Sequence, residues 1–135
     1  MRAFFIVAVL AACACSGSPT QPDRVPKGQP FDLRVGESAL TTDDLRIRFD
    51  TVRSDSRCPM DAFCVRAGEA VIALTIGRTG EVPVGRELDT TPSRSSTTHL
   101  NFTITLSSLA PYPRSDRQIQ PGDYVATLVV RTAAD

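Results

Sequence analysis

The stretch that decides the fold is TTHLNFTITLSSL, which spans residues 97–109. Apolar residues recur there at every second position, and this is the period of a β-strand with one buried face. The alternation predicts one strand over residues 97–106. Its expected inward row is Leu100, Phe102, Ile104 and Leu106, and its expected outward row is His99, Asn101, Thr103 and Thr105.

The strand period recurs along the rest of the chain from residue 31 onward. Segments 44–52, 68–77 and 123–132 show it clearly, and Leu33 and Val35 begin it. Segment 68–77 is apolar on both faces, which favours a central strand. Residues 82–88 are expected to form an edge strand, because Pro83 cannot donate to a neighbour. The expected inward residues of the two amphipathic segments are Leu45, Ile47, Phe49, Tyr124, Ala126, Leu128 and Val130.

Turn-forming residues separate these segments, at Gly36, 77–80, 92–93 and 111–122. No window long enough for a stable helix shows the 3.6-residue period. Six or seven short strands in residues 31–135 therefore predict an all-β domain, either an antiparallel β-sandwich or a small barrel. A sandwich would be Ig-like in architecture only, since the Cys…Trp…Cys signature of immunoglobulin domains is absent.

The first residues indicate export and a lipid anchor. Met1-Arg2 is followed by ten uncharged apolar residues, 3–12, which is the length of a signal-peptide core and too short to span a bilayer. Leu10-Ala11-Ala12-Cys13 matches a bacterial lipobox, so residues 1–12 are interpreted as a signal peptide and Cys13 as the lipid attachment site. Cys15 is the poorer acceptor. The alternative is a soluble secreted protein with a chance cysteine at that position.

Lipidation at Cys13 would place the domain in the cell envelope, with the membrane as its anchor. Two or more acyl chains on one residue give stable anchoring. Ala14 follows the cysteine where an aspartate would favour the inner membrane, so the periplasmic face of the outer membrane is expected in a Gram-negative source.

Residues 13–30 are interpreted as the lipidated N-terminus and a tether. Residues 16–30 contain four prolines, two glycines and two serines, and show no hydrophobic period. Such a tether could hold a domain up to about 45 Å from the bilayer, at about 3.1 Å per residue. In the alternative arrangement, the half nearest Pro30 packs along the domain as irregular edge structure.

The composition argues against several function classes. Fifteen basic residues balance fifteen acidic ones, which removes the positive field that nucleic-acid binding requires. The chain has no phosphate loop, no dinucleotide fingerprint and no HExxH motif, so no cofactor is expected. An envelope protein partner is left open.

Cys58 and Cys64 are expected to form a disulfide, because export places them in an oxidising compartment. Metal ligation is the weaker alternative, since the spacing does not fit a zinc site and no histidine lies nearby. The enclosed residues Met60, Asp61, Ala62 and Phe63 could form a rigid protein-binding loop. The expected arrangement is a simple staple with Phe63 buried, because aromatic residues beside disulfides are commonly buried.

Catalytic chemistry has few candidates in this chain. A single histidine, His99, is expected on the solvated face of its strand, and no nucleophile elbow is present. Four acidic residues near the cysteines could converge on calcium, but turn capping or pairing with Arg53 and Arg57 is the expected role. These four are Asp50, Asp55, Asp61 and Glu69. No catalytic residue and no metal ligand is therefore assigned.

Three short motifs carry a resemblance. DSRCP at 55–59, CVRAGEA at 64–70 and LAPYP at 109–113 resemble segments of a group of small bacterial lipoproteins of unknown function, whose cysteine segment reads D-S-R-C-P, then C-x-W-A-G. Arg66 stands where the tryptophan is usual. The resemblance implies a lipid-anchored, disulfide-bearing β domain and brings no catalytic residues.

The sequence thus predicts a cell-envelope lipoprotein with a non-enzymatic binding or structural role. The first alternative is a protein-binding or protease-inhibitor-like module that uses the 58–64 loop. The second is a carboxylate- or metal-dependent hydrolase.

Overall fold

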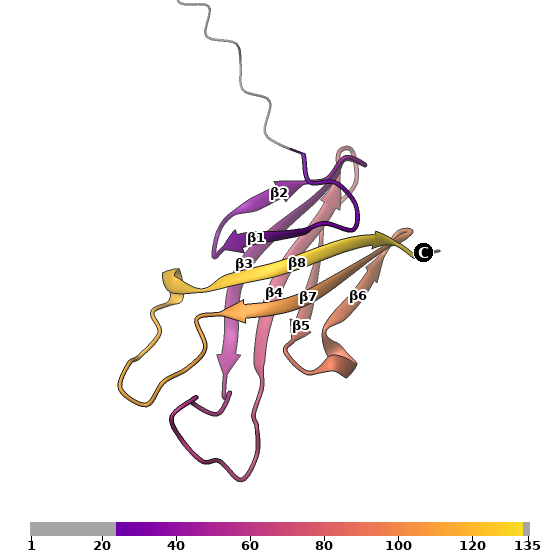
Figure 1. The fold of residues 1–135 in the computed structure, drawn as a ribbon. Coiled ribbons are helices and arrows are strands. Elements are labelled where there is room, and N and C mark those ends of the chain that lie inside the picture. The colour runs from indigo at the N-terminus through magenta and orange to yellow at the C-terminus, as the bar shows by residue number, and fades with distance from the viewer. Residues whose placement is uncertain (1–23, 134–135) are drawn as a thin grey trace, which may run out of the picture.

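The computed structural model describes residues 24–133, which form two four-stranded antiparallel sheets (Figure 1). Within these residues the fold is all-β and open, so the predicted sandwich is confirmed and the barrel is excluded. Eight strands are present where six or seven were predicted. The expected signal peptide, the lipid site at Cys13 and Cys15 lie outside the described residues.

Strands β2 to β5 form one sheet, and β1 joins β6 to β8 in the other. The first sheet has the order β1-β8-β7-β6, and the second has the order β2-β3-β4-β5. The bounds are β1 Pro30–Arg34, β2 Ser38–Leu40, β3 Leu45–Asp55, β4 Ala70–Arg78, β5 Val84–Asp89, β6 Ser96–His99, β7 Phe102–Ala110 and β8 Val125–Thr132, with short 3-10 turns at Pro92–Arg94 and Pro121–Asp123.

Strand order around the sandwich follows order in the chain. Strands β2 to β5 and β6 to β8 each form a meander. The last strand, β8, pairs with the first strand, β1. Immunoglobulin domains instead use Greek-key connections, so the likeness to them is architectural only. The central position of β4 and the edge position of β5 are as predicted.

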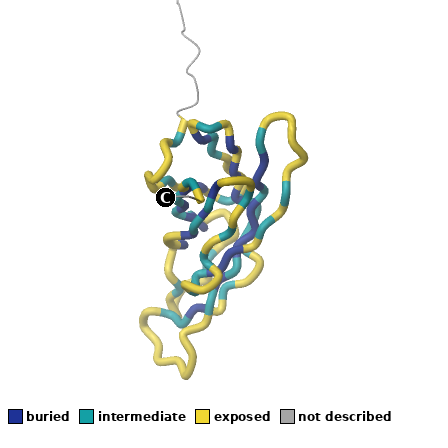
Figure 2. Tube along the Cα trace, turned by 90° about the vertical axis from the view of Figure 1, so that its right-hand side faces the viewer, coloured by how far each residue is buried: buried dark blue, intermediate teal, exposed yellow. Residues whose placement is uncertain are grey.

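The core fills the space between the two sheets, where the buried strand segments lie (Figure 2). The predicted inward rows of β3 and β8 are confirmed, and every residue in them is buried. Phe49 from the second sheet and Phe102 from the first are the largest fully buried side chains. Period-two patterning placed these residues correctly because each strand has one face on the core.

The prediction of a single strand over residues 97–106 is wrong. The chain reverses at Leu100-Asn101, and β6 pairs with β7 so that His99 lies opposite Phe102. Leu100 is exposed in this turn with φ at 54°, a conformation that leucine rarely adopts. Because directly paired residues share a face, His99 lies on the core side and is half-buried, not outward as predicted.

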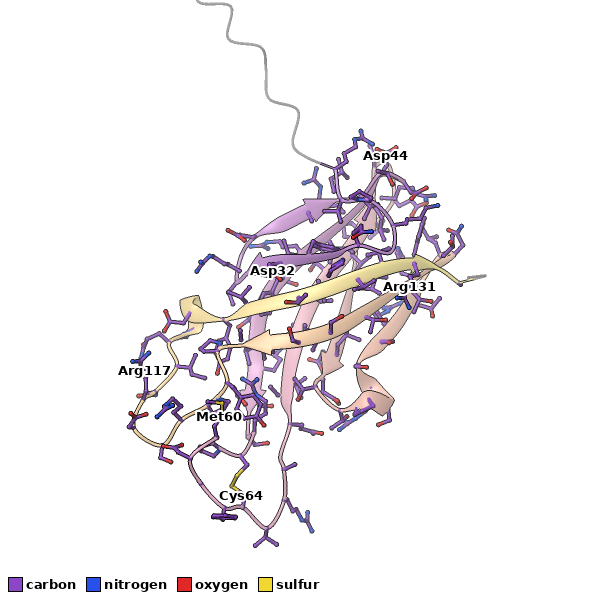
Figure 3. All side chains as sticks on the ribbon, in the orientation of Figure 1. Asp32, Asp44, Met60, Cys64, Arg117 and Arg131 are labelled. Carbon is purple, nitrogen blue, oxygen red and sulfur yellow. A yellow bond between two sulfur atoms is a disulfide. The ribbon has the colours of Figure 1, made fainter. Side chains whose placement is uncertain are left out.

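The part of the expected tether nearest Pro30 packs on the domain. The Val25 amide donates to the Leu40 carbonyl at 2.9 Å, and the Gly28 amide donates to the Val130 carbonyl at 2.8 Å. Arg24 forms an ion pair with Asp44 at 2.6 Å. These contacts tie the first described residues to both sheets, at the end that Asp44 marks in Figure 3.

None of the helical segments in residues 24–133 is long and apolar enough to cross a membrane.

Candidate functional site

Two long loops meet at the end of the sandwich opposite Asp44 (Figures 1 and 3). The β3–β4 loop spans residues 56–69, and the β7–β8 loop spans residues 111–124. The Met60 amide donates to the Pro113 carbonyl at 3.0 Å. Asp61 Oδ1 accepts from the Ser115 amide at 2.9 Å and from the Ser115 hydroxyl at 3.0 Å. The loops are thereby held together, and we call them the loop end.

A buried ion pair joins Asp55, the last residue of β3, to Arg57 in the β3–β4 loop. Arg57 Nε donates to Asp55 Oδ1 at 2.9 Å, and Arg57 Nη2 donates to Asp55 Oδ2 at 2.7 Å. The side chains are only 4% and 8% exposed, respectively. A two-bond geometry of this kind fixes both groups in orientation as well as distance. The predicted pairing of Asp55 with Arg57 is confirmed.

The same arginine reaches the β7–β8 connection. Its Nη1 donates to the Leu109 carbonyl at 2.7 Å, and its Nη2 donates to the Pro111 carbonyl at 3.0 Å. Its guanidinium carbon lies 4.9 Å from the centre of the Tyr112 ring. The DSRCP and LAPYP motifs therefore meet in one buried cluster. We call the pair and these carbonyl contacts the Asp55–Arg57 clamp.

Tyr124 completes the clamp by donating its hydroxyl to Asp55 Oδ2 at 3.1 Å. Burial acts to raise the pKa of Asp55, but the hydrogen bonds and positive charge of Arg57 outweigh it and lower that pKa below its usual 3.8. Burial, together with the negative charge of Asp55, raises the pKa of Tyr124 above 10.0. The clamp thus holds an ionised aspartate and a neutral tyrosine at neutral pH.

The disulfide between Cys58 and Cys64 is present, as predicted, with the two Cα atoms 5.9 Å apart. It closes a small ring within the β3–β4 loop. The base of that loop is also bonded, because the Cys58 amide donates to the Ala67 carbonyl at 2.7 Å. Gly68 has φ at 68°, and a Cβ there would lie 1.8 Å from the Ser56 carbonyl oxygen, so only glycine fits.

The ring and the residue that follows it present apolar side chains to solvent. Phe63 and Val65 are fully exposed and Met60 is 63% exposed. We call these three residues the apolar tip. The expectation that Phe63 is buried is wrong, because the short ring stands beyond the strand ends and away from the core, as the exposed lower loop in Figure 2 shows. Val65 was not singled out from the sequence.

The two loops of the loop end carry no excess of basic residues. The β3–β4 and β7–β8 loops together carry four arginines and four acidic residues. The basic residues are Arg57, Arg66, Arg114 and Arg117, and the acidic residues are Asp61, Glu69, Asp116 and Asp123. Arg57 is buried and paired with Asp55 of β3, so the two loops leave three basic and four acidic residues around the apolar side chains and no excess of positive charge.

The four carboxylates considered for calcium are held by separate partners. Asp55 belongs to the clamp, Asp61 accepts from Ser115, and Glu69 binds Arg94 at 2.7 Å. Asp50 accepts from the Thr75 hydroxyl at 2.7 Å. Arg53 pairs with Glu87, at 3.4 Å, and not with any of the four. Within residues 24–133, no group of three or more histidine, cysteine or acidic residues is placed to hold a metal ion.

His99 stands apart from the loop end. Its Nε2 atom is buried and has no hydrogen-bond partner among residues 24–133. Neither a carboxylate nor a hydroxyl of the described part of the chain is bonded to its ring, so the arrangement offers no activated nucleophile there.

No known protein family, curated protein or solved structure matches this chain. The resemblance carried by the three motifs stays a prediction.

Proposed function

We propose that this chain is a lipid-anchored protein of the cell envelope whose sandwich presents the apolar tip to a protein partner, without catalysis. One observation carries the proposal: Phe63 and Val65 are fully exposed on a loop that is closed by a disulfide. Clusters of exposed apolar side chains on soluble domains mark interaction sites.

The tip is held in place before any partner arrives. The disulfide, the two bonds from Ser115 to Asp61 and the Met60 amide bond fix the ring against the β7–β8 loop. A preordered loop loses less conformational freedom on binding than a mobile one. Phe63 is the natural anchor, because a few aromatic side chains commonly supply most of the energy of a protein interface.

The charge balance favours a protein over a lipid surface as the partner. Attraction to an anionic membrane requires an excess of basic residues, worth about 1 kcal/mol for each lysine or arginine near the surface. The two loops have four charges of each sign and no such excess. An apolar tip whose neighbouring residues carry no excess of basic charge fits a concave apolar site on a protein.

The lipid anchor rests on the lipobox at residues 10–13. Met60 of the apolar tip lies at the opposite end of the domain from Asp44 (Figure 3), which pairs with Arg24, the first described residue. A domain tethered through residues before Arg24 would thus direct the tip away from its attachment. Labelling with a radioactive fatty acid tests the anchor: Cys13→Ser should lose the label and Cys15→Ser should keep it. A labelled Cys13→Ser protein would contradict the assignment.

The binding claim is tested by a photoreactive amino acid placed at position 63 or 65 of the full chain in its native host. We expect one discrete protein to crosslink from both positions. Position 82 is the matched control, since Val82 is 85% exposed on the β4–β5 connection at the other end of the domain. Equal crosslinking of the same protein from position 82, or crosslinking only to lipid from position 63, would overturn the proposal.

A further inference from the structure

A pocket lies beside the loop end, between three segments that are far apart in sequence. It has a volume of about 370 Å³ and is walled by Ala67 and Gly68 of the β3–β4 loop, Thr91 before β6, Ser108 on β7, and Arg57 with Tyr112. This volume is in the lower part of the range of about 300 to 1,000 Å³ that is common for ligand sites. We call it the Tyr112 pocket.

The pocket offers no free charge to a ligand. Arg57 is the charged residue in its wall, and its guanidinium nitrogens already donate to Asp55, Leu109 and Pro111. An ionic ligand would lose its water without gaining an opposite charge, which is costly in a partly enclosed site. The composition of the wall therefore selects against charged groups.

The most specific surface in the pocket is the ring of Tyr112. This residue is 48% exposed, and the Arg57 guanidinium covers the ring at 4.9 Å. The clamp thus fixes the ring as a platform on which a second planar or apolar group can pack. Arg57 already lies over one face of this ring, and a cationic group on the other face would face its positive charge across the ring, so a neutral group is favoured.

Ser108 and Tyr112 are residues of the pocket wall that carry hydroxyl groups. The Ser108 and Tyr112 hydroxyls form no hydrogen bond with another residue in the described part of the chain, 24–133. They are free to bond a peptide group or a ring hydroxyl of a ligand. The small residues Ala67 and Gly68 keep the opposite wall open, and Gly68 cannot be replaced without a clash.

We propose that the Tyr112 pocket receives one uncharged aromatic or aliphatic side chain of the same protein that binds the apolar tip. This inference rests on the proposed function. The argument for a protein occupant is continuity, since one β3–β4 loop carries both the tip and a wall of the pocket. The tip would enter an apolar site on the partner while the partner's side chain enters the pocket.

The test uses the purified full chain and N-acetyl-phenylalaninamide as the probe, followed by amide chemical shifts. Saturable shifts are expected at Gly68, Thr91 and Tyr112, with a dissociation constant on the order of 1 mM for so small a ligand. Tyr112→Ala should weaken binding about tenfold, whereas Tyr112→Phe keeps the ring, loses only the hydroxyl and should weaken binding less. Ala67→Leu fills the pocket with Tyr112 intact and should also abolish the shifts.

Several outcomes would overturn the inference. Equal shifts from N-acetyl-aspartamide or N-acetyl-lysinamide would show that the pocket does not select neutral groups. Binding of methyl glucoside in place of the phenylalanine amide would make it a sugar site. Unsaturable shifts, or unchanged affinity in Ala67→Leu, would show that no pocket ligand exists. If these failures occur while position 63 still crosslinks a protein, the proposed function stands and only the pocket fails.

Discussion

Replacing Arg57 with methionine should strongly destabilise the domain. Methionine has an unbranched apolar side chain that can occupy the same channel, so the loss is electrostatic more than steric. The change removes the two bonds to Asp55 and the bonds to the Leu109 and Pro111 carbonyls. Asp55 would be left with the Tyr124 hydroxyl and local backbone contacts in a site where its side chain is 8% exposed.

The expected cost follows from that burial. Removing one partner of a buried ion pair typically destabilises a protein by roughly 3 to 5 kcal/mol, because a buried charge is left uncompensated. The matched control is Arg53→Met, since Arg53 pairs with Glu87 at 3.4 Å and both side chains are 62% exposed. Exposed pairs contribute about 0 to 1 kcal/mol, so the control should be nearly neutral.

Urea unfolding followed by far-ultraviolet circular dichroism measures both variants. With a urea slope of roughly 1 to 3 kcal/mol per molar, the Arg57→Met midpoint should fall by at least about 1 M. If this variant does not fold, Arg57→Lys keeps the charge but not the two-bond geometry and should show a smaller loss. Equal midpoints for Arg57→Met and Arg53→Met would refute the role of the clamp.

The pH dependence gives a second readout of the same clamp. The pKa of Asp55 is lowered in the folded protein, so its contribution to stability is present at neutral pH and is lost as pH falls below about 3.9 toward the folded pKa. In Arg57→Met the burial that raises the pKa of Asp55 remains, while the side-chain bonds and the positive charge of Arg57 that lower it are gone. The carboxyl resonance of Asp55 should therefore titrate at higher pH in that variant, and an unchanged titration would contradict the assigned cause.

Three further predictions concern the ring, the core and Tyr124. Replacing both Cys58 and Cys64 with alanine should cost about 2 kcal/mol in urea unfolding, with the β-sheet spectrum retained, since the disulfide closes only a small loop; two free thiols in the exported native protein would contradict the assignment. Phe102→Ala should cost roughly 3 to 5 kcal/mol, because its side chain is fully buried, whereas Thr103→Ala on the half-buried face should cost at most about 1 kcal/mol; the reverse order would mean the strand faces the other way. The pKa of Tyr124 is raised, so its contribution is present below about pH 10 and is lost as pH rises through the folded value; a thermal melting series across that range should show a drop that Tyr124→Phe lacks.

Strand identity and core rows were predictable where a strand keeps one face on the core. Phe49 is an example, since apolar and polar residues alternate strictly from Leu45 to Asp50. The hairpin at Leu100 was missed because an apolar residue occupies the turn. The alternation of apolar residues therefore runs on through the turn. The residues that face the core have odd numbers in β6, such as His99, and even numbers at the start of β7, such as Phe102.

The loop end was predictable only in part. The disulfide and the pairing of Asp55 with Arg57 join residues close in sequence, so their spacing was enough to predict them. The bonds from Arg57 to the carbonyls of the β7–β8 connection join residues more than fifty positions apart, and no local pattern encodes them. Exposure of Phe63 likewise depends on how far the ring stands from the core, which is a tertiary property.

The central claim is that the apolar tip binds a protein, and the affinity of the full chain for the protein crosslinked at position 63 tests it most directly. Loss of an aromatic anchor typically costs about 2 kcal/mol or more, so Phe63→Ser should weaken binding by about thirtyfold. Val82→Ser removes another exposed apolar side chain at the other end and should leave the affinity within about twofold. Equal affinities for the two variants would contradict the account.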